Sequence, residues 1–227
     1  MLGFHKFSVD LNSILDASGF SASVFTNEGT LDGQLLLKLA LMGILFGVVG
    51  GGFAKLLGLS QDFFAKKFPN TIKRIAIMGA GLSVLLLVFF QGRYAGLGTN
   101  LLDMCFTGTA AGIGNVAGYD WIIKFAVTIL TLSAGFIGGV VTPLFAIGAT
   151  FGIFIAGAFG MPLALAAALG FAAVFASASN TLWAPILIAG EIFGFDCLPA
   201  FFIVCTVAYI CNGGQSIYKQ KKIRIKI

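Results

Sequence analysis

A glycine-rich turn at residues 138–143, with the sequence GGVVTP, has the residue types and spacing best suited to bind an ion. Charged residues and histidine are absent from residues 125–190, so the turn lies inside a membrane-embedded region. Irregular backbone is tolerated there only where it is buried in protein or lines a polar cavity. Gly138 and Gly139, followed by Pro143, predict the start of a half-helix. The positive end of its dipole can face an anion at mid-membrane.

The composition indicates an all-α integral membrane protein. Of 227 residues, 58% are hydrophobic and 10% are charged, against about a quarter charged in soluble domains. His5 is the only histidine, and the four cysteines lack CxxC spacing, so no metal site and no cofactor is indicated. A membrane enzyme ranks lowest among the possible functions, because the apolar segments hold no cluster of acids, histidines or nucleophile–base pairs.

The hydrophobic pattern predicts helices that are broken, tilted or partial, as in transporters and channels. Residues 1–34 are expected to form an extracytoplasmic connector, 35–218 the transmembrane part, and 219–227 a basic cytoplasmic tail. The expected segments are a span at 35–59, an amphipathic piece at 61–68, a span at 75–90, a polar break at 91–98, a short apolar piece at 101–106, and a helix from about 119. Later cuts are expected at Gly138–Gly139, Gly160–Pro162, Ser177–Asn180, Pro185, Gly194 and Pro199.

The distribution of lysine and arginine predicts the orientation of the chain. Basic residues cluster after the first span and in the tail, and such residues favour the cytoplasmic side. The C-terminus is therefore expected inside, in what is interpreted as a bacterial plasma membrane, and the acidic N-terminal segment outside. Nucleic-acid binding is a weaker explanation of the basic tail, because the tail follows a hydrophobic helix.

Three segments resemble the second half of CLC anion channels and transporters: GGVVTPLF from Gly138, the stretch from Phe171 to Gly194, and GGQSIY at the end of the apolar region. The resemblance covers residues 35–218 and implies the second inverted-repeat half of a CLC-type fold. It also implies that backbone amides at the start of a partial helix bind fluoride or chloride, with a tyrosine hydroxyl donating to the same ion. The residues that this places at the site are Gly139, Val140, Val141, Thr142 and Tyr218.

Within the family the chain looks most like the bacterial fluoride/proton antiporter branch. Fluoride is small and strongly hydrated, so its site needs several close donors, and the Thr142 hydroxyl suits that demand. Taken alone, a membrane threonine more often bonds back to a carbonyl one turn earlier, and the resemblance reverses that preference. Fluoride-type members usually carry Glu where this chain has Val140, which bears on proton coupling. They also tend to have Pro where it has Leu182, which affects only a helix start.

The resemblance places the start of this chain near the connector between the two halves of a CLC subunit. The expected partner is therefore a separately encoded N-terminal half or a full-length subunit, in a dimer as in the family. The alternative is a non-transporting remnant of an interrupted gene that only inserts into the lipid bilayer or dimerises. Glu191, near a predicted helix end, is interpreted as structural, because nothing in the sequence places it near Thr142.

Overall fold

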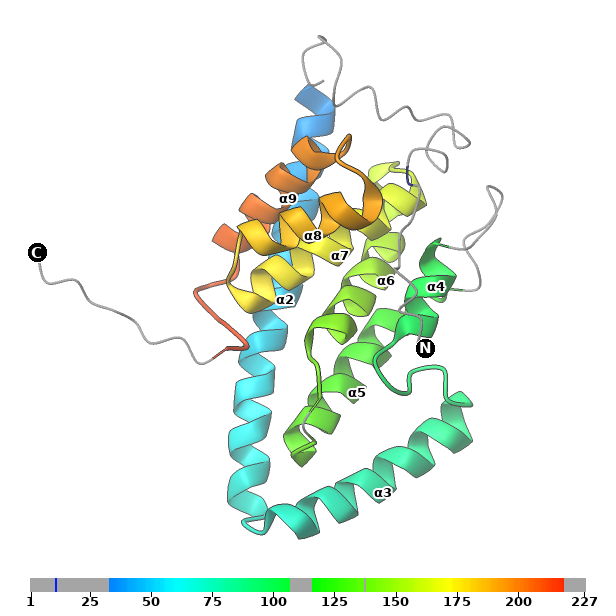
Figure 1. Cartoon of the computed structure of the whole chain (residues 1–227), viewed down its shortest axis with the longest axis vertical. Coiled ribbons are helices and arrows are strands. Elements are labelled where there is room, and N and C mark those ends of the chain that lie inside the picture. Colours follow the sequence, from blue (N-terminus) through cyan, green and yellow to red (C-terminus); the bar gives the residue numbers. More distant parts are fainter. Residues whose placement is uncertain (1–10, 12–32, 107–115, 137, 219–227) are drawn as a thin grey trace, which may run out of the picture.

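The chain folds into a bundle of helices of very different lengths (Figure 1). The computed structural model describes residue 11 and residues 33–106, 116–136 and 138–218, apart from the side chains of Phe89 and Phe90. Within these residues there are eight helices and no strand. They are α2 (Gly33–Lys67), α3 (Thr71–Phe90), α4 (Thr99–Phe106), α5 (Asp120–Ala134), α6 (Val141–Phe159), α7 (Leu163–Ser179), α8 (Trp183–Phe193) and α9 (Leu198–Ile210).

The centre of the bundle is α7, which is buried from Ala164 to Ser179. It packs against α2, α6, α8 and α9, and its broadest contact is with α6. The two helices cross so closely that a Cβ atom on Gly148 of α6 would collide with the carbonyl group of Gly170 of α7. Small residues at such a crossing let two membrane helices approach backbone to backbone. This contact fixes α6, and with it the turn that precedes α6.

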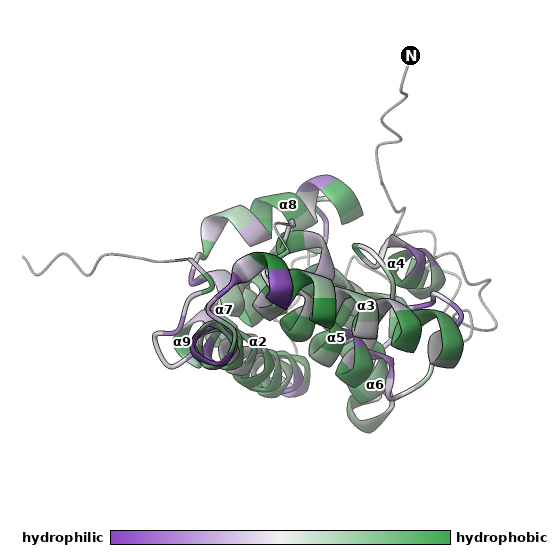
Figure 2. Cartoon of the chain, turned by 90° about the horizontal axis from the view of Figure 1, so that it is seen from below, coloured by the Kyte–Doolittle hydropathy of each residue, from purple (hydrophilic) through white to green (hydrophobic). Residues whose placement is uncertain are grey.

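Three of the described helices are long and apolar enough to cross a membrane: Gly33–Lys67, Thr71–Val88 and Val141–Phe159. The apolar helices α7, α8 and α9 are shorter, with 17, 11 and 13 residues. Hydrophobic residues dominate nearly every helix surface (Figure 2). The prediction of partial and broken helices in an all-α membrane fold is confirmed.

The second predicted span, α3, lies apart from the rest of the bundle. It crosses one end of the molecule and packs mainly on α5 (Figure 1). Asn70 begins it, since the side-chain oxygen accepts from the amides of Ile72 at 3.1 Å and Lys73 at 3.3 Å. No residue within Thr71–Val88 is buried. One side of α3 faces α5 through partly buried residues such as Leu82 and Leu86, and many of its other apolar side chains are exposed.

Three predicted boundaries are wrong. Residues 61–67 do not form a separate amphipathic piece, because α2 continues through them to Lys67 without a break. Pro185 and Pro199 do not cut the chain either: they lie in the first turns of α8 and α9, where a missing N–H costs no hydrogen bond. The breaks at 91–98, 138–139, 160–162 and 194 are where the sequence predicted them. The proposed connector and tail lie almost wholly outside the described residues.

Candidate anion site at the start of α6

The glycine-rich turn leads directly into α6, as its sequence predicts. Val140 is the N-cap residue, and the helix begins at Val141. The amide of Leu144 donates to the Val140 carbonyl at 3.2 Å, which closes the first turn. The amides of Val140, Val141 and Thr142 precede that bond and have no acceptor within the helix, and Pro143 has no N–H to offer. The helix start therefore presents three free amide donors at the positive end of its dipole.

Thr142 differs from the other threonines inside the helices. Four of them donate to the carbonyl one turn earlier at 2.6–2.7 Å, and they are Thr128, Thr131, Thr150 and Thr206. Thr142 makes no such bond within the described residues, because residue 138, four positions earlier, lies outside the helix. Its half-buried hydroxyl is left available to a ligand.

The start of α6 separates two cavities. One, of about 200 Å³, is lined by Thr142 and by residues of α4, α7 and α8, including Asp103 and Phe171. The other, of about 270 Å³, lies on the α3–α5 side, and the turn contributes Gly138, Gly139 and Pro143 to its wall. Gly139 and Thr142 thus face different spaces.

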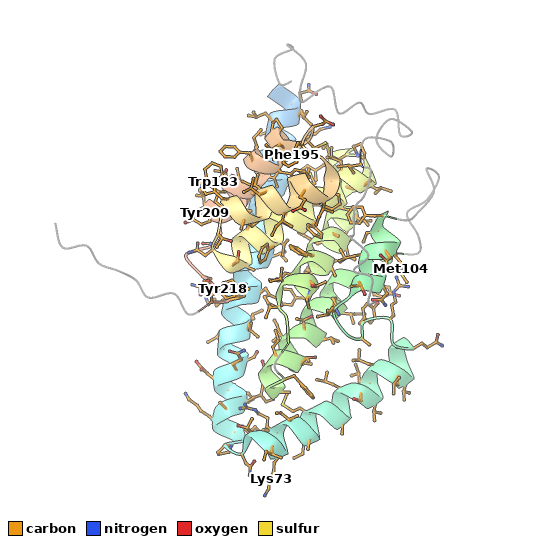
Figure 3. All side chains as sticks on the ribbon, in the orientation of Figure 1. Lys73, Met104, Trp183, Phe195, Tyr209 and Tyr218 are labelled. Carbon is orange, nitrogen blue, oxygen red and sulfur yellow. The ribbon has the colours of Figure 1, made fainter. Side chains whose placement is uncertain are left out.

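Tyr218 lies at the C-terminal end of α7, on a segment that returns from α9 (Figure 3). The amide of Ile217 donates to the Ala178 carbonyl at 2.8 Å, and the Ser216 hydroxyl donates to the Ser179 carbonyl at 3.0 Å. The antiparallel register of α6 and α7 places Gly148 beside Gly170, and continuing it puts Ala178 level with Val140. Tyr218 is 48% exposed at that level. The segment therefore lies at the same height as the turn.

A buried polar cluster beside the turn was not predicted from the sequence. Asp120 accepts hydrogen bonds from the Arg93 guanidinium and the Tyr94 hydroxyl, both at 2.5 Å, and from the Ala117 amide at 2.9 Å. Lys124, one turn further along α5, donates to the carbonyls of Tyr94 at 3.0 Å and of residue 96 at 2.9 Å. The signal in the sequence was an acid and a base four residues apart at the start of an apolar helix.

This polar cluster fixes the break between α3 and α4 against the first turn of α5. Asp120 and Lys124 are buried in a chain where intramembrane charges are costly and commonly functional. Lys124 also lines the cavity that contains Gly138 and Gly139. The turn and a buried lysine therefore share the wall of one cavity.

The remaining candidates contribute little to the site. Glu191 is exposed on α8, while its neighbour Ile192 lines the cavity that contains Thr142. Three cysteines are buried among apolar residues and the fourth is half-buried: Cys105, Cys197, Cys205 and Cys211. Among the described residues, no group of three or more His, Cys, Asp or Glu side chains could hold a metal ion.

A half-helix with free amides beside two cavities, in an all-helical membrane fold, is the architecture of ion channels and secondary transporters. A family model for the voltage gated chloride channel matches residues 9–213. The chain belongs to this family, which includes the CLC proteins.

Similar proteins include transporters of both halides. The chain is 33% identical over 189 residues to a chloride/fluoride channel protein of Pseudomonas syringae pv. tomato, covering 80% of this chain and 40% of the relative. It is 32% identical over 127 residues to an H(+)/Cl(-) exchange transporter of Salmonella paratyphi B, covering 55% of this chain and 26% of the relative. The crystal structure of a CLC-type fluoride/proton antiporter matches with a TM-score of 0.83 and 44% identity, covering 96% of this chain and 50% of that chain. The chain thus spans half or less of the length of these relatives.

Proposed function

We propose that this chain forms one half of a CLC-type pathway that carries fluoride or chloride across the membrane. The anion is bound by the amides of Val140 and Val141 and by the hydroxyls of Thr142 and Tyr218, and Gly139 leaves room for it beside the backbone. One observation carries the proposal: the Thr142 hydroxyl and the adjacent helix amides have no acceptor among the described residues. Unused donors at a helix N-terminus form a site for an anion.

Fluoride is the preferred substrate in this proposal. A small anion loses more hydration energy on entering a site and depends more on each close donor, so the threonine hydroxyl favours fluoride over chloride. Similarity to a chloride/fluoride channel protein and to a fluoride/proton antiporter supports this preference. Proton exchange does not pass through residue 140, since valine has no titratable group.

The other half of the pathway comes from residues outside this chain, either an N-terminal half or a full-length subunit in a dimer. The coverage of 40–50% of the more similar relatives supports this part of the proposal. The half-exposed Tyr218 also supports it, because a central ion site would be covered on all sides. The chain is oriented with the α2–α3 junction and the tail at residues 219–227 in the cytoplasm, and with residues 1–34 outside.

Anion flux from liposomes tests the proposed function. The chain is reconstituted alone and together with the first half of the fluoride/proton antiporter that it resembles, and fluoride and chloride efflux are recorded with ion-selective electrodes. We expect flux from the combined protein and none from the chain alone. Absence of fluoride and chloride flux in both preparations would contradict the proposal and favour a non-transporting remnant.

Substitution of Thr142 tests the residue that carries the proposal. Thr142→Ala removes a donor to a charged group, which weakens fluoride binding by about ten- to hundredfold and chloride binding less. Thr142→Ser keeps the hydroxyl and largely keeps the selectivity. Thr150→Ala in the same helix is the matched control, because the Thr150 hydroxyl already donates to the Ala146 carbonyl at 2.7 Å. Unchanged fluoride selectivity in Thr142→Ala would remove the support for fluoride.

A further inference from the structure

Three parts of the chain meet at the C-terminal end of α7, and Asn212 joins them. Asn212 follows α9 directly and is 5% exposed. Its side-chain amide nitrogen donates to the Asn180 side-chain oxygen at 2.8 Å and to the Ser177 carbonyl at 3.2 Å. Its side-chain oxygen accepts from the amide of Gly214 at 2.6 Å. One side chain therefore links the end of α9, the end of α7 and the segment that follows.

The C-terminal end of α7 is held in place by a helix cap. Asn180 adopts the left-handed conformation, with φ of 55°, and the Thr181 amide donates to the Ala176 carbonyl at 3.2 Å. This is the pattern of a helix capped by a left-handed residue. Since α7 is the most buried helix of the bundle, a group bonded to its capped end has a defined position.

From Asn212 the chain reverses and runs along that end toward Tyr218. Gly213 and Gly214 have φ of 67° and 70°, a left-handed pair that suits glycine and makes the reversal. The next residues are held by the bonds of Ser216 and Ile217 to the α7 carbonyls. The position of Tyr218 thus depends on the bonds that hold this return segment, residues 213–218, to α7.

We propose that Asn212 is a positioning residue that holds the Tyr218 hydroxyl at the level of the α6 turn. This inference rests on the proposed function, because it gives Tyr218 an anion to bind. Asparagine suits the role because it donates to the capped end of α7 and accepts from the return segment at the same time. Aspartate keeps the acceptor and loses the donor, and alanine loses both.

The test is 19F NMR of the full chain carrying 3-fluorotyrosine. The chain has four tyrosines, so four resonances are expected, and Tyr218→Phe assigns one of them. Asn212→Ala should shift or broaden the Tyr218 resonance and leave the Tyr94 resonance unchanged. Asn212→Asp should give a smaller change in the same resonance, and it replaces Asn212→Ala if that variant does not fold. Ser177→Ala is the control, because it removes the 2.7 Å bond to the Gly47 carbonyl at the same end of α7 without touching the return segment.

Sodium fluoride titration of the same samples connects the positioning to the anion. In the wild-type chain the Tyr218 resonance should move with fluoride, and in Asn212→Ala the midpoint should rise by about tenfold. A Tyr218 resonance unaltered by both Asn212 variants would overturn the positioning role, as would equal changes in Ser177→Ala. A wild-type Tyr218 resonance that does not move with fluoride would instead count against the proposed function. The role of Asn212 would still be decided by comparing the Tyr218 resonance of the wild-type chain with that of the Asn212 variants.

Discussion

Two apolar helices of this chain, α7 and α3, have opposite surroundings. Every residue of α7 after Leu163 is buried, and the helix contacts five others. No residue in the membrane-length stretch of α3 is buried, and Ile72 and Leu87 are 79% and 69% exposed. Both helices are strongly hydrophobic, so their overall hydrophobicity does not separate them.

The comparison shows which features of an apolar helix place it inside the protein. α7 is rich in alanine and has Gly170 at its crossing with α6, and such small residues allow close approach of helix backbones; α3 carries large aliphatic side chains over most of its second half. In lipid the hydrophobic effect does not drive helices together, so packing of small residues decides the contacts. The proposed anion site lies on the packed side, because α6 is held by its crossing with α7.

The largest difference between the two helices is expected from adding one methyl group. Gly170→Ala in α7 places a Cβ atom against the Gly148 backbone, and overpacking of this kind costs about 1–3 kcal/mol. Gly81→Ala in α3 meets no atom within 4 Å and should stabilise the helix by about 0.5–1 kcal/mol. Thermal unfolding midpoints in detergent should therefore move in opposite directions. Equal shifts of the unfolding midpoint in Gly170→Ala and Gly81→Ala would mean that the α6–α7 crossing is not tightly packed.

A smaller effect, on labelling and not on stability, is expected at the α2–α3 junction, beside the exposed helix α3. Gln61→Cys near the α2–α3 junction should react with a membrane-impermeant maleimide only from the cytoplasmic side, because lysines cluster there. Ser18→Cys should react from outside, and both are made with Cys211→Ser, since Cys211 is half-buried and the other cysteines are buried. Labelling of Gln61→Cys from outside intact cells would reverse the proposed orientation.

Much of the fold could be predicted from the sequence because glycine and proline mark the breaks. Gly138–Gly139 precede the start of α6, Gly160 ends that helix, and the short α4 follows from its short apolar run. The continuation of α2 through residues 61–67 could not be predicted, because lysines in a last helical turn look the same as a separate amphipathic piece. Pro185 was misread because proline is tolerated in a first turn.

The site could be predicted only in part. The turn and Thr142 follow from local sequence, since a helix start is a local event. The bonds of Asp120 to Arg93, and of Lys124 to carbonyls in the same break, join residues about 30 positions apart, and a pattern search does not pair them. The role of Asn212 likewise depends on contacts with α7 that no spacing reveals.

The central claim is that an anion binds at the start of α6, and anomalous diffraction from crystals soaked in sodium bromide tests it most directly. Bromide substitutes for the proposed halide ligand and is visible by its anomalous scattering. The account predicts an anomalous peak within hydrogen-bonding reach of the Val141 amide and the Thr142 hydroxyl. A peak beside Lys124 with none at the start of α6, or no ordered bromide near the turn, would contradict it.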